Sequence, residues 1–213
     1  MKNTLLFILS IGLLVTSACK KDNSDNESNN DNNTNTFTAA YYIKGTLDGV
    51  SVDIQQVSIT SGYNSGMIGG SEGAQNPAMC LHSQGSTFTN PFIAGTPEYY
   101  TGIYKVFPPD EYDECNLSYA EYESILHTGS FSYASASSEE GAFVHYVDAN
   151  RTYWSTEAGS QAGSTFNITS YTTDPTGAAP KIAKYEFDCK LYDDDGNVKT
   201  FRATWNGRAI AYQ

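Results

Sequence analysis

Short runs of alternating apolar and polar residues extend over most of this chain, separated by Gly, Asn, Asp and Pro. Tyr, Thr, Val, Ile and Phe dominate these runs, which is the composition of β-strands. Because the runs recur at intervals of about ten residues, they predict an antiparallel β-sandwich or barrel of about eight to eleven strands. The strands are predicted over residues 41–47, 50–60, 79–83, 101–107, 129–134, 141–147, 152–156, 164–171, 181–192, 198–205 and 208–212.

Recognisable turns join several of these strands. Asp48-Gly49, Asn206-Gly207 and the segment Asp193-Asp194-Asp195-Gly196 contain residues that tolerate positive φ, and each predicts a β-hairpin. Residues 61–73 are rich in Gly and Ser and predict a loop. Residues 118–126 predict the one helical turn of the domain.

The N-terminus has a different pattern. A basic start at Met1-Lys2 precedes an apolar run over residues 5–15 and the small residues Thr16-Ser17-Ala18, which is typical of a secretory signal peptide. The apolar run is too short to cross a bilayer as a helix. Since Cys19 directly follows the small residues, the segment predicts a bacterial lipoprotein whose acylated Cys19 becomes the new N-terminus. The alternative is an ordinary secretory signal, because lipoprotein signals usually carry Leu where this chain has Thr16.

The sequence therefore predicts three parts. They are a lipoprotein signal peptide (1–18), a lipidated cysteine with a disordered polar tether (19–36), and a single all-β domain (37–213). The tether contains no large apolar residue and cannot bury enough surface to offset its chain entropy. About 17 such residues span roughly 20–25 Å when relaxed, which would hold a small domain clear of the lipid headgroups. The predicted location is the outer membrane of the cell envelope, on the periplasmic or the surface-exposed side.

Several short motifs resemble those of a known group. They are Thr101-Gly102-Ile103-Tyr104, Thr204-Trp205-Asn206-Gly207-Arg208, Tyr153-Trp154-Ser155-Thr156 and residues 163–169, which follow a polar tether and an opening hairpin. This layout resembles small uncharacterised all-β lipoproteins of Bacteroidota, over most of the chain. The resemblance implies an all-β fold and carries no known activity. In that group, acidic residues soon after the lipidated cysteine are associated with export to the cell surface.

The predicted domain is strongly acidic. Residues 37–213 contain nine basic and twenty acidic side chains, which leaves a net charge of −11. This charge disfavours nucleic acid and anionic lipid as partners, because both require a basic patch. It is compatible with neutral ligands or metal cations, and it also keeps an exported protein soluble.

The chain has four cysteines. If Cys19 carries lipid, then Cys80, Cys115 and Cys189 remain, and this odd number allows at most one disulfide with one leftover thiol. The sequence leaves the pairing among these three open. It contains no CxxC segment, so the spacing fits no zinc site.

Two groups of residues are candidates for binding. Asp193, Asp194 and Asp195 could supply oxygen ligands for calcium, although an acidic hairpin turn without metal is the favoured interpretation. No other cofactor is predicted. Tyr153 and Trp154 follow a predicted turn at residues 148–151 and could form a platform for a sugar ring. The alternative is that these aromatic residues only pack as half-buried strand residues.

No catalytic constellation is recognisable in the sequence. The three histidines form no HExxH pair, and no GxSxG segment is present. The sequence therefore predicts a non-catalytic, lipid-anchored envelope protein whose β-domain binds a protein partner or a ligand, with a neutral glycan as the favoured small ligand. The alternatives are a surface glycan-degrading enzyme with paired carboxylates and a structural or adhesive subunit.

Overall fold

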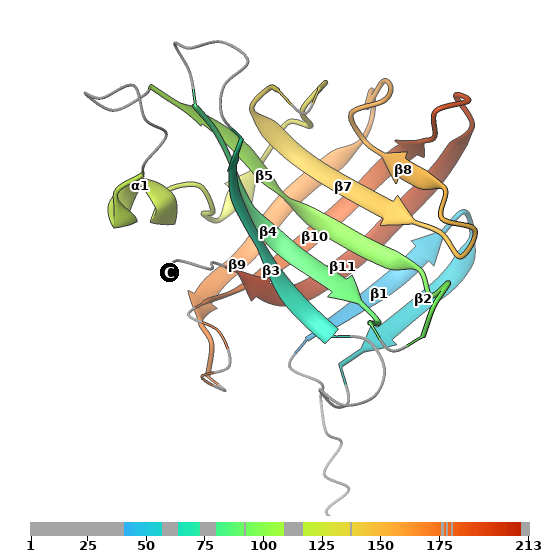
Figure 1. Ribbon diagram of the computed structural model, residues 1–213, viewed down its shortest axis with the longest axis horizontal. Helices are drawn as coiled ribbons and strands as arrows, with labels where there is room; N and C mark the ends of the chain where they lie inside the picture. The colour runs from blue at the N-terminus through green and yellow to red at the C-terminus, as the bar shows by residue number, and fades with distance from the viewer. Residues whose placement is uncertain are drawn as a thin grey trace, which may run out of the picture. The chain divides into compact units, whose positions relative to one another are not determined.

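Strands make up most of the domain, and the predicted antiparallel all-β fold is confirmed (Figure 1). The computed structural model describes residues 41–56, 64–72, 80–91, 93–108, 117–136, 138–175, 177, 179 and 181–209. Its eleven strands lie within the predicted range. The elements are β1 (Tyr42–Leu47), β2 (Val50–Gln55), β3 (Asn64–Glu72), β4 (Cys80–Thr89), β5 (Glu98–Phe107), α1 (Tyr119–Glu123), β6 (Gly129–Ser130), β7 (Gly141–Val147), β8 (Tyr153–Ser155), β9 (Thr165–Thr173), β10 (Lys181–Tyr192) and β11 (Val198–Ala209).

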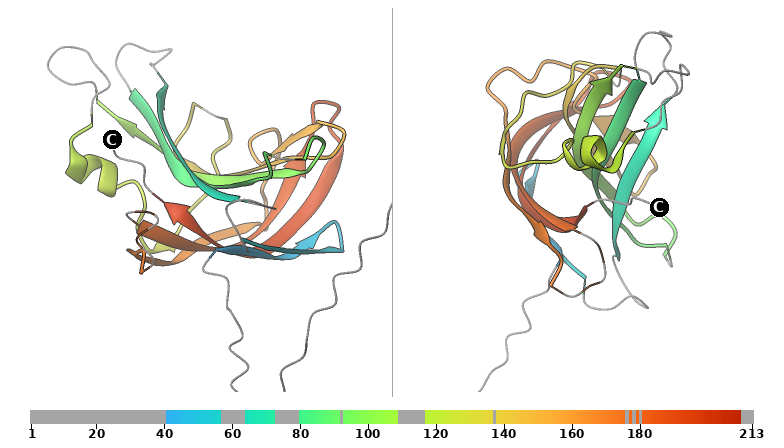
Figure 2. Two further views of the ribbon diagram at one scale, coloured as in Figure 1. Left: turned by 60° about the horizontal axis from the view of Figure 1, so that its bottom comes forward. Right: turned by 90° about the vertical axis from the view of Figure 1, so that its left-hand side faces the viewer.

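The strands form one sheet that folds over itself. They pair in the order β2-β1-β11-β10-β8-β7-β5-β4-β3, with β9 also beside β10 and β6 beside β9. Within the described strands the sheet does not close, because β2 and β3 end this hydrogen-bonded order. The left view of Figure 2 shows that β3, β4 and β5 form one layer across the layer of β9, β10, β11 and β1. The Ser86 hydroxyl links the two layers by donating a hydrogen bond to the carbonyl oxygen of Arg208.

One side chain completes the sheet between β8 and β9. Both strands pair with the same edge of β10, β9 along residues 181–188 and β8 only at Tyr192. Between them, the Gln161 amide donates to the Lys190 carbonyl oxygen over 2.6 Å and accepts from the Lys190 amide over 3.1 Å. The Gln161 side chain therefore replaces a missing strand, since buried backbone groups need partners.

The core lies between the two layers. Alternate residues of β10 and β11 point inward, and the Phe201, Tyr185 and Trp205 side chains are fully buried. Phe88 of β4 meets the Trp205 ring edge-on at a centroid distance of 5.4 Å. Burying each such side chain contributes roughly 1.5–3 kcal/mol relative to leaving it in water. The alternation in the sequence thus produces an apolar interior.

Two turn and loop predictions were wrong. Residues 64–72 form β3 although Gly and Ser predicted a loop, because pairing along the whole of β4 supplies the hydrogen bonds that local propensity does not favour. The predicted turn at Asn206-Gly207 is absent, and β11 continues through it to Ala209. A Cβ atom on Gly207 would lie 2.5 Å from Trp205 Nε1, so close packing explains the glycine there.

The cysteines are partly assigned. Cys80 is in a disulfide whose partner lies outside the described residues, while Cys189 is a free thiol that is 1% exposed. Cys19 and Cys115, with the signal peptide and the tether, also lie outside the described residues. In the part of the chain that the structure describes, no helix is long and apolar enough to span a membrane.

Candidate functional site

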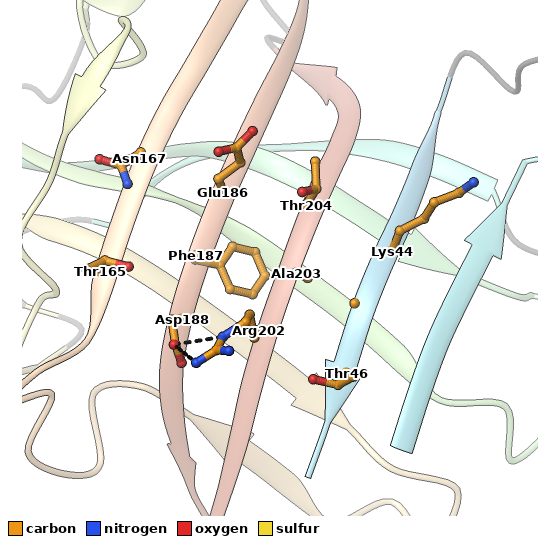
Figure 3. A pocket seen from close by; sticks show the side chains of 11 residues that line it. Lys44, Thr46, Thr165, Asn167, Glu186, Phe187, Asp188, Arg202, Ala203 and Thr204 are labelled. Atoms are coloured by element: carbon orange, nitrogen blue, oxygen red, sulfur yellow. Dashed lines mark hydrogen bonds and ion pairs between the residues drawn. The ribbon is translucent and has the colours of Figure 1, made fainter. Parts of the chain in front are cut away.

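A broad hollow lies on the outer face of β1, β11, β10 and β9 (Figure 3). Its volume is about 550 Å³. Outward-facing side chains of the four strands line it, since every second residue of a strand points to the same face. They include Lys44, Thr46, Asn167, Glu186, Asp188, Arg202 and Thr204. We call this surface the polar hollow.

Three of the four charged side chains that line the polar hollow form ion pairs, namely Glu186, Asp188 and Arg202. Arg202 donates to Asp188 through both Nε and Nη2, and the dashed lines of Figure 3 mark these contacts. Lys184 Nζ lies 3.0 Å from Glu186 Oε1. Phe187, the aromatic residue of the described lining, is only 3% exposed. The described lining of the polar hollow therefore offers hydroxyl groups, paired charges and the exposed Lys44, but no exposed ring.

The predicted pair Tyr153 and Trp154 does not form one platform. These neighbours on β8 point to opposite faces of the sheet, and Tyr153 is 46% exposed whereas Trp154 is 6% exposed. The Lys199 ammonium group lies 4.0 Å from the centre of the Trp154 ring, and Trp154 Nε1 donates to Asp148 Oδ2 over 3.3 Å. Trp154 is thus a core residue, and Tyr153 is the member of the pair that a ligand could reach.

Tyr153 belongs to a row of four rings that crosses the outer faces of β5, β7 and β8. The centroid distances are 4.4 Å from Tyr104 to Phe143, 4.8 Å from Phe143 to His145, and 5.3 Å from His145 to Tyr153. Phe143 is 2% exposed and supports the rings on either side. Gly102 of β5 makes room for it, since a Cβ atom there would lie 2.8 Å from Phe143 Cζ. We call these four residues the aromatic row.

A nearly buried histidine–carboxylate pair includes one ring of the aromatic row. Glu157 Oε1 is 2.7 Å from His145 Nε2, and the two side chains are 9% and 14% exposed. Burial tends to raise the pKa of Glu157, but the contacts with His145 and a hydrogen bond from Thr156 outweigh it and lower the pKa below its ordinary value. The pair fixes the orientation of the His145 ring. The pair's side-chain hydrogen bonds within the described part of the chain join His145, Glu157 and Thr156.

A second network fixes the turn beside Tyr153. Glu98 accepts hydrogen bonds from the Tyr100 hydroxyl and from the Arg151 guanidinium group, and these bonds lower the pKa of Glu98. Burial and the bond to Glu98 raise the pKa of Tyr100 to about 12. Arg151 has φ of 68°, a left-handed conformation that is uncommon for a non-glycine residue. The network therefore holds the strained turn against β5.

The predicted calcium ligands lie at a tight turn. The Asp193 carboxylate accepts hydrogen bonds from the Asp195 amide and from the amide and side chain of Asn197, and the side-chain bond is the largest cause of its lowered pKa. Asp194 and Asp195 are exposed. Across the described residues, no three His, Cys, Asp or Glu side chains lie close enough together to hold a metal ion. The calcium site remains a prediction.

The inner face of β4 is polar, which the sequence analysis missed. His82, Gln84 and Ser86 alternate along this strand and are at most 4% exposed. Gln84 Nε2 donates to the Tyr122 carbonyl oxygen of α1 over 2.6 Å. His82 Nε2 and Gln84 Oε1 have no hydrogen-bond partner among the described residues. The sequence predicted a strand only over residues 79–83, whereas β4 continues to Thr89 and includes Gln84 and Ser86.

These features describe an acidic, antiparallel β-domain with two distinct outer surfaces. Comparison with protein-family models, with curated proteins and with solved structures found no significant match.

Proposed function

We propose that this protein is a lipid-anchored protein of the cell envelope whose β-domain binds a neutral glycan without transforming it. The lipid anchor is proposed from the position of Cys19, which directly follows the small residues at the end of a signal-like segment and precedes a polar tether. The anchor holds the domain at the outer membrane. The aromatic row provides the ligand contact, with Tyr153 as its exposed ring.

The position of Tyr153 in the fold supports this proposal. The chain enters the described domain at Tyr41, and β1 runs from there to the Asp48-Gly49 turn. Strand registers align this turn with the end of β10 at Tyr192, which pairs with β8 at Ser155. Tyr153 therefore lies toward the end of the domain opposite Tyr41, and its ring is 46% exposed there to a ligand.

The charge of the domain supports a neutral ligand. A net charge of −11 over residues 37–213 repels acidic sugars. The exposed Tyr153 ring offers an apolar face to the C–H groups of a sugar, while the carboxylates and the guanidinium group nearby can bond to hydroxyl groups. These carboxylates belong to Glu98 and Glu157, and the guanidinium group belongs to Arg151.

The anchor is tested by feeding cells radiolabelled palmitate. Wild-type protein is expected to incorporate label and to sediment with membranes, whereas Cys19→Ala is expected to do neither. Cys189→Ala serves as the control because the Cys189 thiol is buried. A Cys19→Ala protein that is labelled and sediments like the wild type would contradict the anchor.

Ligand binding is tested on an array of neutral and acidic glycans, with and without calcium. Binding to neutral glycans is expected, weakened in Tyr153→Ala and unchanged in Tyr42→Ala on the outer face of β1. Chromatography of the bound glycan after prolonged incubation is expected to recover it intact. Absence of binding to every glycan would refute the ligand, and release of shorter products would refute the non-catalytic role.

A further inference from the structure

A second concave surface lies at the α1 end of the domain. It is a cleft of about 280 Å³ between β5, the segment that follows α1, and the start of β7. Aromatic side chains from separate segments line it, namely Tyr104, His127 and Phe131, with Ile125 as an apolar neighbour. The His127 and Phe131 rings are 5.0 Å apart. Ligand sites in proteins are commonly concave and apolar with a few polar groups, which is the composition of this cleft.

The polar groups of the cleft have opposite charges. Lys105 and Glu140 both line it, so the cleft presents one cation and one anion to a ligand. Lys105 Nζ donates to the Ser124 hydroxyl over 3.3 Å, and Glu140 Oε1 accepts from the Val106 amide over 2.9 Å. These bonds hold the two side chains at the cleft. A neutral ligand with hydroxyl groups can bond to both, whereas a charged ligand would be repelled by one of them.

The cleft and Tyr153 lie at opposite ends of the aromatic row. Tyr104 lines the cleft and stacks on Phe143, and Gly141 at the start of β7 also lines the cleft. At the other end of β7, Val147 is in register with Tyr153 of β8. Seven residues of strand extend for about 20 Å at the usual rise of about 3.4 Å per residue.

We infer that the ligand is a linear, neutral oligosaccharide that lies along β7, with one sugar ring in the cleft and another on Tyr153. This inference rests on the proposed function and adds the length of the ligand. A single sugar ring is similar in size to one tyrosine ring and cannot contact both ends of β7. The buried Phe143 supports Tyr104, and His145 supports Tyr153, so the two contact points are held at a fixed separation.

The test is calorimetric titration with cello-, xylo-, malto- and manno-oligosaccharides of one to six units. For the oligosaccharide series that binds, Kd is expected to fall at least about tenfold from one sugar unit to six. The reason is that a chain already bound at Tyr153 or in the cleft makes the other contact as an intramolecular step. Tyr153→Ala and Phe131→Ala are each expected to raise Kd for the six-unit ligand about fivefold or more. Tyr42→Ala, an aromatic truncation away from the row, is expected to leave Kd unchanged.

Each other outcome overturns the inference in a distinguishable way. If Tyr153→Ala weakens binding but variants of the cleft do not, the proposed function stands and the ligand does not extend to the cleft. If one unit binds as tightly as six, the ligand is a single sugar. If no oligosaccharide binds, the proposed function fails as well. Phe131 also packs against the core, so Phe131→Ala could unfold the domain. In that case His127→Ala, which changes an exposed side chain, tests whether the ligand contacts the cleft.

Discussion

The polar hollow and the aromatic row lie on outer faces of the same sheet, but they are built differently. The polar hollow is larger than the cleft beside the aromatic row, yet most of its charges are paired and the aromatic residue of its described lining is buried. The aromatic row has less concave volume near it, but it combines the exposed Tyr153 ring with polar groups that are fixed by hydrogen bonds. The comparison teaches that volume alone does not make a binding site, because affinity comes from a few well-supported contacts.

The largest expected difference between the two faces is in packing. Phe143→Ala removes a ring that is 2% exposed and supports both neighbours, so the free energy of unfolding is expected to fall by about 3–5 kcal/mol. Thr204→Ala in the polar hollow is expected to change it by less than about 0.5 kcal/mol. Urea unfolding measures both. Similar losses in the two variants would show that the aromatic row is no better packed than the hollow.

The ion pairs of the two faces should also differ. Glu157→Gln removes the charge from a pair that is nearly buried, and the free energy of unfolding is expected to fall by about 1.5–3 kcal/mol. His145→Gln should cost less stability in the Glu157→Gln background than in the wild type, where it breaks both the pair and the ring contacts. A double-mutant cycle in urea measures this coupling. Additive losses would mean that the 2.7 Å contact contributes nothing of its own.

Acid should weaken the aromatic face through the same carboxylate. The pKa of Glu157 is lower in the folded protein than its ordinary value of 4.5, so its stabilising effect is fully present above about pH 4.5 and is lost as the pH falls through the lower folded value. The free energy of unfolding of the wild type should therefore decrease more steeply below pH 4.5 than that of Glu157→Gln. Parallel pH curves for the two proteins would contradict the direction of this pKa shift.

The contact between Lys199 and Trp154 provides a test of the inner face of β8, opposite to Tyr153. Lys199→Met keeps the apolar stem but removes the ammonium group from the Trp154 ring, and the expected loss of unfolding free energy is about 0.5–1 kcal/mol. Tyr153→Ala should leave this loss unchanged because the two aromatic residues point to opposite faces. Thermal unfolding of the single and double variants measures the effect. A loss that depends on Tyr153 would show that the faces are coupled.

The smallest effect is expected at the polar hollow. Arg202→Gln breaks the pair with Asp188, whose side chains are 76% and 40% exposed, and such pairs contribute about 0–1 kcal/mol. Any loss should shrink in 1 M salt because exposed charges are screened there. Urea unfolding at low and high salt measures it. A loss larger than that of Glu157→Gln would reverse the comparison between the two faces.

Local patterns predicted much of the fold. The Asp48-Gly49 turn adopts φ of 52° and 78°, as its composition requires, and α1 lies within the predicted helical segment 118–126. Ser118 and Glu121 form a capping box there, which is a local interaction. These elements were predictable because neighbouring residues determine them. β3 was not predictable from local sequence, because its Gly- and Ser-rich segment becomes a strand only beside β4.

The candidate surface was predicted only in part. Tyr153 was identified from its type and its place after a turn, but His145, Tyr104 and Phe131 were not, since they come from distant segments that pairing brings together. The alternation rule alone would have separated Tyr153 from Trp154, because neighbouring strand residues face opposite sides. It could not have told which of the two faces inward.

The sequence by itself determined the class of fold, the acidic charge and the turns at residues 48–49 and 193–196, because these depend on composition and on short-range periodicity. The tertiary structure decided which face of each strand is buried, since the period of two defines two faces without saying which one meets the core. It also decided that β5, β7 and β8 align their aromatic side chains into one row. Strand order depends on long-range pairing, and no local pattern in this chain encodes it.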